Sequence, residues 1–369
     1  MRAVVLEATG RPTRVEDLEL RDPGPGEVRV GIAASGVCHS DLHVRDGEWE
    51  RPGPLVLGHE GAGWVEAVGR GVERPAVGDF VALSWYYPCL RCRHCEAGRQ
   101  WLCQGSGSLR HRLPDGSTPL RRKDGQEVVA YLAIGTMAEA TVTAASAAIP
   151  LPANVPAEVA ALIGCCVSTG VGAILKTAEV PAGASVVVIG LGGVGLSAVM
   201  GAVVAGASRI VGVDRRAEKL DMARELGATD TILATDDEST AAAIRAATRG
   251  GPDFAVEAIG LRTTIELAIA VLPPGGTAVL AGLTPFGERA SFEAFPFVDG
   301  ARRILGSNYG AAVAAVDFPR YADLFLAGRL PIDRLVSHRI GLDDVEAAFD
   351  AMRRGEGLRQ VIAFERSRR

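Results

Sequence analysis

The chain has 369 residues, a length that predicts two domains because a single hydrophobic core rarely grows this large. Its 39 basic and 44 acidic side chains nearly balance and give a formal net charge of −5. Without a basic excess or a long run of like charge, nucleic acid and anionic membranes are unexpected partners. The N-terminus has a strand-like apolar start followed by Glu7 and lacks signal-peptide features, so we expect a cytoplasmic protein.

Short apolar segments separated by glycine and proline dominate the beginning of the chain. Residues 2–6 and 27–32 alternate apolar and polar positions around a Pro-Gly-Pro-Gly turn, and further apolar segments lie at 64–68 and 79–83. This pattern predicts a mainly β first domain with long functional loops. The polar stretch 105–127 is expected to be a surface loop.

Two separated residues form half of a candidate catalytic zinc site. Cys38 opens the segment Cys-His-Ser-Asp-Leu-His, and His59 lies in Gly-His-Glu-Gly. A thiolate and an imidazole suit Zn²⁺, and a catalytic site needs a third protein ligand and an open fourth position. Cys165 and Cys166 are the cysteines beyond residue 103, so one of them is expected to complete the site.

A second group of cysteines has the spacing of a closed metal site. Four thiols fall within fifteen residues in the pattern Cys-x₂-Cys-x₂-Cys-x₇-Cys, at Cys89, Cys92, Cys95 and Cys103. Such crowding suits a tetrahedral Cys₄ zinc site better than disulfides in a cytoplasmic protein.

From about residue 156 the pattern changes to apolar helices alternating with short β-branched segments, which predicts a doubly wound parallel α/β sheet. Residues 184–207 carry no charge, but their six glycines disfavour a continuous membrane-spanning helix, so we expect a strand, a turn and a helix. Further strands at 253–257, 276–280 and 303–307 predict about six strands, with the chain returning to the first domain after Tyr309 and ending in a strand at 357–362.

The turn after the strand at 185–189 carries a dinucleotide-binding pattern. Its glycines would allow a tight turn and a close approach of the backbone to a pyrophosphate at the helix N-terminus. Asp214 lies nineteen residues past the last glycine and would bind ribose hydroxyls, which favours NAD over NADP. Arg215 and Arg216 follow directly and would partly offset repulsion of a 2′-phosphate. The residues of this turn are Gly190, Gly192, Gly193, Val194 and Gly195.

Together these features resemble the zinc-containing medium-chain alcohol dehydrogenases over nearly the whole chain. The resemblance implies a mainly β GroES-like catalytic domain, residues 1–166 and 310–369, with a zinc-binding lobe at 89–103. It also implies an NAD-binding Rossmann domain at 167–309. In this family a Cys₂His set binds the catalytic zinc. The Gly-Cys-Gly that precedes Ser-Thr-Gly in relatives matches Cys165 as the ligand, with Cys166 in place of a glycine.

The resemblance also implies roles for residues around the metal. Asp41 would orient His59 through a hydrogen bond, and Glu60 would lie beside the metal. Ser40 and His43 would pass the proton released from a bound alcohol through the cofactor ribose towards solvent. Zinc would act as a Lewis acid that lowers the pKa of that alcohol.

Cofactor and substrate contacts follow from the same resemblance. Lys219 and Arg359 match cofactor-binding positions, Arg359 at the pyrophosphate. His39 stands where many relatives carry arginine, and histidine offers fewer donors, so NADH binding is expected to be weaker and more dependent on pH. Trp49 and Trp85 would line an apolar substrate pocket.

The expected function is reversible hydride transfer between a primary alcohol or aldehyde and NAD(H), with two zinc ions per subunit. One alternative is a dehydrogenase of S-hydroxymethyl adducts of mycothiol. Glutathione is less favoured because neither the acidic residue expected at Trp49 nor the basic one near Gly107 is present. Another alternative is a cofactor-binding protein without dehydrogenase activity. We also expect a homo-oligomer, a dimer or tetramer, built on the cofactor domains through an edge strand near Ile304.

Overall fold

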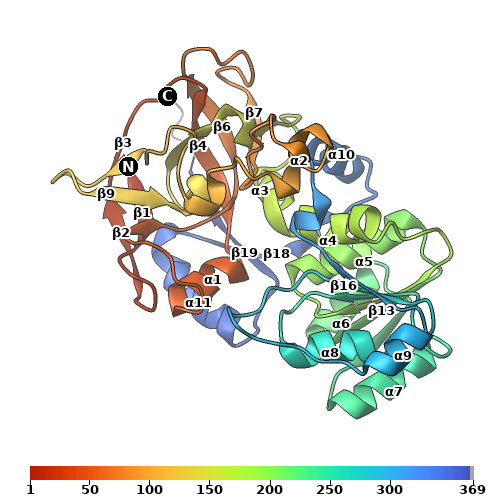
Figure 1. Ribbon diagram of the computed structural model, residues 1–369. Helices are drawn as coiled ribbons and strands as arrows, with labels where there is room; N and C mark the ends of the chain where they lie inside the picture. The colour runs from red at the N-terminus through yellow and green to blue at the C-terminus, as the bar shows by residue number, and fades with distance from the viewer. Residues whose placement is uncertain (366–369) are drawn as a thin grey trace. The chain divides into compact units, whose positions relative to one another are not determined.

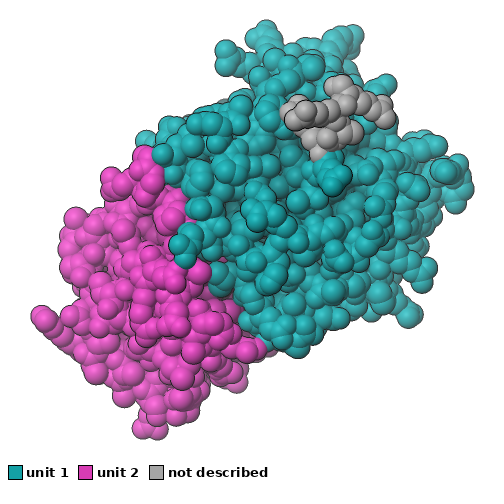
Figure 2. Space-filling model, turned by 180° about the vertical axis from the view of Figure 1, so that it is seen from behind, with its two compact units in different colours: residues 1–165, 313–326, 332–369 teal, residues 166–312, 327–331 magenta. Residues whose placement is uncertain are grey.

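The computed structural model describes residues 1–365 (Figure 1) and divides the chain into two compact units. Unit 1 comprises Met1–Cys165, Val313–Leu326 and Ile332–Arg369, and unit 2 comprises Cys166–Ala312 and Ala327–Pro331. Figure 2 colours the two units separately. The predicted division at residues 166 and 310 omits the segment 327–331, which belongs to unit 2.

Unit 1 is mainly β structure, arranged in two sheets. The first has the strand order β2-β1-β5-β9-β8-β3, and the second has the order β11-β7-β6-β4-β19-β18, with β10 paired to β4. Apolar residues alternate along β4, and its buried positions face one of the hydrophobic cores of this unit. The strands are β1 Arg2–Leu6, β2 Thr13–Asp17, β3 Glu19–Leu20, β4 Glu27–Gly36, β5 Leu55–Val56, β6 Glu60–Val68, β7 Phe80–Leu83, β8 Leu120–Arg121, β9 Glu127–Ala130, β10 Ala140–Ala144, β11 Ala148–Pro150, β18 Val336–Ile340 and β19 Arg359–Ala363.

One stretch of unit 1 is more ordered than its polar sequence predicts. Residues 105–127 contain a 3₁₀ turn at Ser108–Arg110 and the strand β8, so the expectation of a surface loop was wrong for these parts of the stretch. Leu113 and Leu120 are buried there, and the N–H of Leu132 donates to Nδ1 of His111 over 3.0 Å. A few buried side chains are therefore enough to hold this stretch against the sheet.

Helices of unit 1 connect and cover these strands. They are α1 His39–Asp46, α2 Arg93–Glu96, α3 Ala157–Leu162, α10 Ala314–Leu326 and α11 Val345–Arg353. α1 begins at Cys38, where Asp41 accepts from the Cys38 N–H in a capping box, and it ends at Gly47 in the left-handed conformation. The final strand expected near the end of the chain is confirmed as β19, whereas β18, which is only partly buried, was not predicted.

Unit 2 is a six-stranded parallel sheet in the order β14-β13-β12-β15-β16-β17. This is the strand order of a Rossmann fold, and it confirms the predicted doubly wound sheet. Ile304 lies on β17, so the expected edge position of that strand is also confirmed. The strands are β12 Ser185–Ile189, β13 Arg209–Asp214, β14 Asp230–Leu233, β15 Phe254–Glu257, β16 Thr277–Leu280 and β17 Arg303–Gly306. The helices are α4 Ser168–Gly172, α5 Gly193–Ala205, α6 Ala217–Glu225, α7 Asp237–Ala247, α8 Arg262–Ala270 and α9 Ala294–Asp299.

Two apolar stretches could be mistaken for membrane spans. Residues 184–207 form β12, a glycine turn and α5, as predicted. The helical segment Ala157–Thr177 is long and apolar enough to cross a membrane, but 89% of its most apolar window is buried inside the protein. The burial of this segment is therefore that of a core helix.

Charged side chains fix α1 to the C-terminal helix α11. Glu346 of α11 accepts from Arg45 of α1, with Nη2 and Oε2 2.6 Å apart. The backbone N–H and the hydroxyl of Thr13 also donate to Glu346, over 2.7 and 2.6 Å. At the end of α1, Asp46 accepts from Nε of Arg353 over 2.9 Å. Two ion pairs thus join segments that are far apart in sequence.

This network predicts a pH-dependent contribution to stability. Burial alone would raise the pKa of Glu346, but hydrogen bonds from Arg45 and Thr13 outweigh it and lower the pKa. A lowered pKa means that the stabilisation is fully present above the unfolded-state value of about 4.3 and is lost as pH falls through the folded-state value. We expect Glu346→Gln to lower the free energy of unfolding by about 1–2 kcal/mol at neutral pH, and this difference to shrink below about pH 4.3.

Urea unfolding of both proteins at several pH values measures this difference. Glu356→Gln, in the exposed ion pair of Glu356 with Arg354, serves as the control. It should change stability by no more than about 0.5 kcal/mol. A Glu346→Gln loss that stays constant down to the acid unfolding region would contradict an ionic contribution.

Candidate metal and dinucleotide sites

The loop before α1 and the start of β6 bring Cys38 and His59 together in unit 1. Both side chains are buried. Asp41 lies beneath them: its Oδ1 accepts from the N–H of Gly58 over 2.9 Å and lies 3.3 Å from Nδ1 of His59. Gly58 has φ +93°, and a Cβ there would meet the Met137 nitrogen at 2.4 Å, so a larger residue does not fit this turn. Asp41 thus fixes both the turn and the orientation of the imidazole.

Cys165 reaches the same cluster from a π-helical turn, Ile163–Val167. Single π turns inside helices occur often at functional sites, because they redirect a side chain. Gly164 allows the close approach, since a Cβ there would meet the Leu83 carbonyl oxygen at 2.7 Å. Ligand atoms of Cys38, His59, Glu60 and Cys165 all lie within 4.8 Å of one another, and the four residues are buried. Cys166, also buried, is not part of this group.

The electrostatics of this cluster suit a metal ion. A hydrogen bond from the Cys165 thiol, together with the charges of Arg359 and His59, lowers the pKa of Cys38 well below its usual value despite burial. Burial lowers the pKa of His59, but Asp41 and Cys38 outweigh it and raise that pKa well above its usual value. Nε2 of His59 is buried without a hydrogen-bond partner of normal geometry among residues 1–365. Two sulfurs and an imidazole nitrogen so placed are a donor set that fits zinc.

Glu60 and Arg359 form a buried ion pair beside this cluster. Nη1 of Arg359 lies 3.5 Å from Oε1 of Glu60 and donates to the Val37 carbonyl over 3.1 Å. Burial raises the pKa of Glu60 to about 7, although the positive charge of Arg359 opposes it. The structure therefore places Arg359, predicted to bind the cofactor pyrophosphate, against a carboxylate within unit 1.

The residues of the predicted proton relay lie on α1. Ser40 and His43 are both half-buried, and His39 is exposed at the first position of the helix. The His39 and His43 rings lie 5.7 Å apart, and His43 stacks on Trp49 with ring centroids separated by 4.5 Å. Trp49 is buried, at 6% exposure, so most of its indole packs within unit 1.

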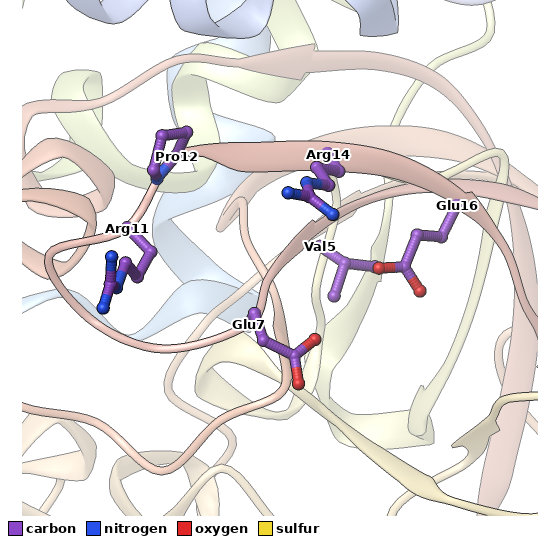
Figure 3. Close-up of a pocket in the computed structure, with 6 residues that line it drawn as sticks. All are labelled: Val5, Glu7, Arg11, Pro12, Arg14 and Glu16. Atoms are coloured by element: carbon purple, nitrogen blue, oxygen red, sulfur yellow. The ribbon is translucent and has the colours of Figure 1, made fainter.

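The second predicted pocket residue, Trp85, is half-buried and packs edge-on against Tyr86, with centroids 5.5 Å apart. A pocket of about 400 Å³ does occur in unit 1, but at another place. Figure 3 shows its side chains, which come from β1, β2 and the loop between them. They are Val5, Glu7, Arg11, Pro12, Arg14 and Glu16, and none of them is a predicted site residue.

The four cysteines of the 89–103 lobe converge as the spacing predicts. Their sulfur atoms lie within 4.8 Å of one another, and all seven cysteines of the chain are free of disulfides. The N–H of Cys89 donates to the sulfur of Cys103 over 3.2 Å. Backbone donors from Cys95 and Gln104 lower the pKa of Cys92 to about 5, whereas burial raises that of Cys95 to about 12. This is the geometry of a closed Cys₄ metal site.

In unit 2 the glycine-rich turn lies between β12 and α5. Gly190 has φ +92°, and a Cβ on Gly195 would meet the Gly190 carbonyl oxygen at 1.7 Å, so strand and helix touch backbone to backbone. Gly192 precedes the first turn of α5, and Gly193 and Val194 begin it. The N-terminus of a thirteen-residue helix therefore follows an open glycine turn, an arrangement that can bind a pyrophosphate.

Asp214 lies at the end of β13, beside this turn. Its Oδ2 accepts from the N–H of Leu191 over 2.8 Å, and its Oδ1 accepts from the N–H of Arg216 over 3.0 Å. Arg215 and Arg216 are exposed, and Lys219 is half-buried on α6. These positions leave a carboxylate and three cations around the place where an adenosine ribose would bind.

Sequence reasoning missed a buried carboxylate in unit 2. Glu257, at the end of β15, accepts from the N–H groups of Ile259 and Gly260 over 2.9 and 2.8 Å, and from the Thr264 hydroxyl over 2.8 Å. The loop it fixes puts Ile259 against Gly190, where an added Cβ would meet Cγ1 at 2.2 Å. An acidic residue ending a fully buried strand was the available signal.

A GroES-like unit with a buried Cys₂His cluster and a Cys₄ lobe, together with a Rossmann unit, defines the class of zinc-binding dehydrogenases. The family described as "Alcohol dehydrogenase GroES-like domain" matches residues 24–153, and the "Zinc-binding dehydrogenase" family matches residues 193–327. The chain belongs to the zinc-containing medium-chain alcohol dehydrogenase family.

Similar proteins cover the chain from end to end. "Alcohol dehydrogenase class-3" of Drosophila melanogaster is 36% identical over 98% of this chain and 97% of its own length. "S-(hydroxymethyl)glutathione dehydrogenase" of Paracoccus denitrificans is 35% identical over 98% of this chain and 99% of its own. The crystal structure of benzyl alcohol dehydrogenase from Acinetobacter calcoaceticus has a TM-score of 0.90 and 32% identity, and covers 99% of each chain.

Proposed function

We propose that the chain is a zinc-dependent alcohol dehydrogenase that transfers hydride reversibly between a primary alcohol or its aldehyde and NAD(H). The observation that carries this proposal is the buried cluster of Cys38, His59 and Cys165, in which Nε2 of His59 has no hydrogen-bond partner among residues 1–365. Such a cluster would cost stability unless a metal paired with it. Bound zinc would supply a Lewis acid that polarises the substrate oxygen.

The protein's own residues would prepare both partners for the reaction. Asp41 orients His59, and Ser40 with His43 would carry the substrate proton away from the buried centre. In unit 2 the turn at Gly190 would hold the dinucleotide phosphates, and Asp214 the ribose. Because the Asp214 charge repels a 2′-phosphate, we propose NAD as the preferred cofactor. Lys219, His39 and Arg359 are proposed to add cationic contacts to it.

Oxidation of thiol adducts is the second candidate, because relatives at 35–36% identity carry class-3 and S-(hydroxymethyl)glutathione dehydrogenase names. Two features weigh against glutathione. Trp49 packs on His43 where those enzymes usually have an acidic residue. At Gly107 an added Cβ would meet the Tyr87 hydroxyl at 2.1 Å, so a basic side chain does not fit there without rearrangement. Oxidation of a mycothiol adduct stays an alternative.

A substrate panel tests the proposed function. We expect the highest kcat/KM for primary alcohols with an apolar body, such as benzyl alcohol, with NAD, because the half-buried indole of Trp85 offers apolar surface. Bulky secondary alcohols should be poor substrates. The panel includes NADP and the S-hydroxymethyl adducts of glutathione and mycothiol. A higher kcat/KM for a thiol adduct would reassign the substrate, and zinc-loaded protein without turnover on any member would point to a binding protein.

We also propose a homo-oligomer formed through unit 2. β17 lies at the edge of its sheet, and β16 is its one partner strand within residues 1–365. The segment between β16 and β17 exposes several large apolar side chains, namely Leu283, Phe286, Phe292, Phe295 and Val298. Apolar surface beside an edge strand fits self-association by a two-fold axis.

The seven cysteines, none of them in a disulfide, fit a reducing compartment, and we propose the cytoplasm.

A further inference from the structure

The end of α1 holds the His43 imidazole from two sides. Nδ1 of His43 lies 2.5 Å from Oε2 of Glu48. The ring stacks on the Trp49 indole, with centroids 4.5 Å apart and planes at 25°. The guanidinium of Arg51 in turn lies 6.0 Å from the centroid of the Trp49 ring. One ring nitrogen and one ring face are therefore occupied by neighbouring side chains.

The backbone builds this arrangement locally. Gly47 ends α1 with φ +85°, a conformation that other residues rarely adopt. The N–H groups of Glu48 and Trp49 then both donate to the carbonyl of His43, over 3.0 and 3.2 Å. The reversed chain brings the Glu48 and Trp49 side chains back onto His43. A carboxylate that is 44% exposed is thus fixed on a histidine side chain that is only 16% exposed.

We propose that Glu48 is a positioning residue for the proton relay, an inference that rests on the proposed function. Neutral imidazole carries one N–H, and because Glu48 accepts it at Nδ1, Nε2 remains as the proton acceptor. The proton that leaves the alcohol would pass by way of Ser40 and the ribose of the bound cofactor to Nε2 and give imidazolium. The charge of the imidazolium is paired with the Glu48 carboxylate, and transfer of that proton to water restores the neutral ring.

Two charged neighbours of His43 on α1 form their ion pairs elsewhere. On α1 itself Arg45 and Asp46 bond to Glu346 and Arg353 of α11. The centroids of the His39 and His43 rings lie 5.7 Å apart, and the Arg51 guanidinium lies 6.0 Å from the centroid of the Trp49 ring. Within residues 1–365, Glu48 is the group that forms a hydrogen bond with the His43 ring. A change at Glu48 should therefore reach His43 without a competing carboxylate taking its place.

The experiment follows one turnover of the holoenzyme with saturating NAD and benzyl alcohol, recording NADH absorbance and proton release to a dye. It is run in weak buffer from pH 6 to 9. We expect Glu48→Ala to slow both signals about tenfold, which is part of the ~100-fold or more that a positioned acid–base group contributes. Added imidazole buffer should restore both rates. Glu48→Gln keeps an acceptor for Nδ1 but loses the charge, so its loss should be smaller. Glu50→Gln, the next acidic residue and an exposed one, is the matched control and should match wild type.

A double-mutant cycle separates positioning from general stabilisation. In a His43→Gln background, Glu48→Ala should have no further effect, because the residue acts through the imidazole. Additive losses, or a Glu48→Ala rate equal to that of Glu50→Gln, would overturn the inference while leaving the relay in place. If His43→Gln itself reacts like wild type, the relay in the proposed function fails instead. Thermal midpoints of all variants show whether any loss comes from unfolding.

Discussion

Cys38→Ser is expected to abolish alcohol oxidation while leaving the fold intact. Serine keeps the approximate size of the side chain but lacks a thiolate, and Cys38 is the member of the cluster whose pKa its neighbours lower. Without that sulfur, His59 and Cys165 would hold zinc weakly. Loss of Lewis-acid assistance worth several kcal/mol corresponds to a fall in kcat of about 10³-fold or more.

Metal analysis and circular dichroism accompany the activity measurement. The two metal groups of the chain predict about two zinc ions per wild-type chain and about one in Cys38→Ser. Cys166→Ala is the matched control, since Cys166 is buried next to Cys165 but lies outside the cluster. It should keep both metals and most of the activity. Full turnover by Cys38→Ser would show that the ligands are assigned wrongly. The same conclusion would follow if Cys166→Ala lost a metal ion and Cys165→Ser kept both.

The parts of the site that could be predicted from sequence are those set by local spacing. Cysteines with two residues between them can place their sulfurs on one metal ion, and glycines between a strand and a helix can form only a few turns. The position of Cys165 depends instead on a π turn, which depends on packing around Gly164 and leaves no clear sequence pattern. Short strands such as β3, with two residues, also lack a detectable period.

Charged residues illustrate the same limit. Glu48, Arg359 and Glu257 each look like surface residues in the sequence, since acidic and basic side chains are seldom buried. The fold places both Arg359 and Glu257 inside. Arg359 donates to the carbonyl of Val37, which is distant in the chain, whereas Glu257 accepts from N–H groups of the loop that follows it. Pairing of this kind depends on the tertiary fold and could not be read from periodicity or composition.

Cys95→Ser should destabilise unit 1 without acting on the chemistry directly. Cys95 is buried, and its sulfur lies 3.6 Å from that of Cys92 in the Cys₄ group. Because a closed site couples metal binding to folding, removing one ligand should cost about 3 kcal/mol or more. We expect Cys95→Ser to have a lower thermal midpoint, while its activity per folded molecule stays close to wild type. The wild-type midpoint should fall to the same value when a chelator removes this metal. Glu96→Gln, at the next and exposed position of α2, is the control and should keep the wild-type midpoint. If Cys95→Ser kept the wild-type midpoint and still responded to chelator, the lobe would not be a structural metal site.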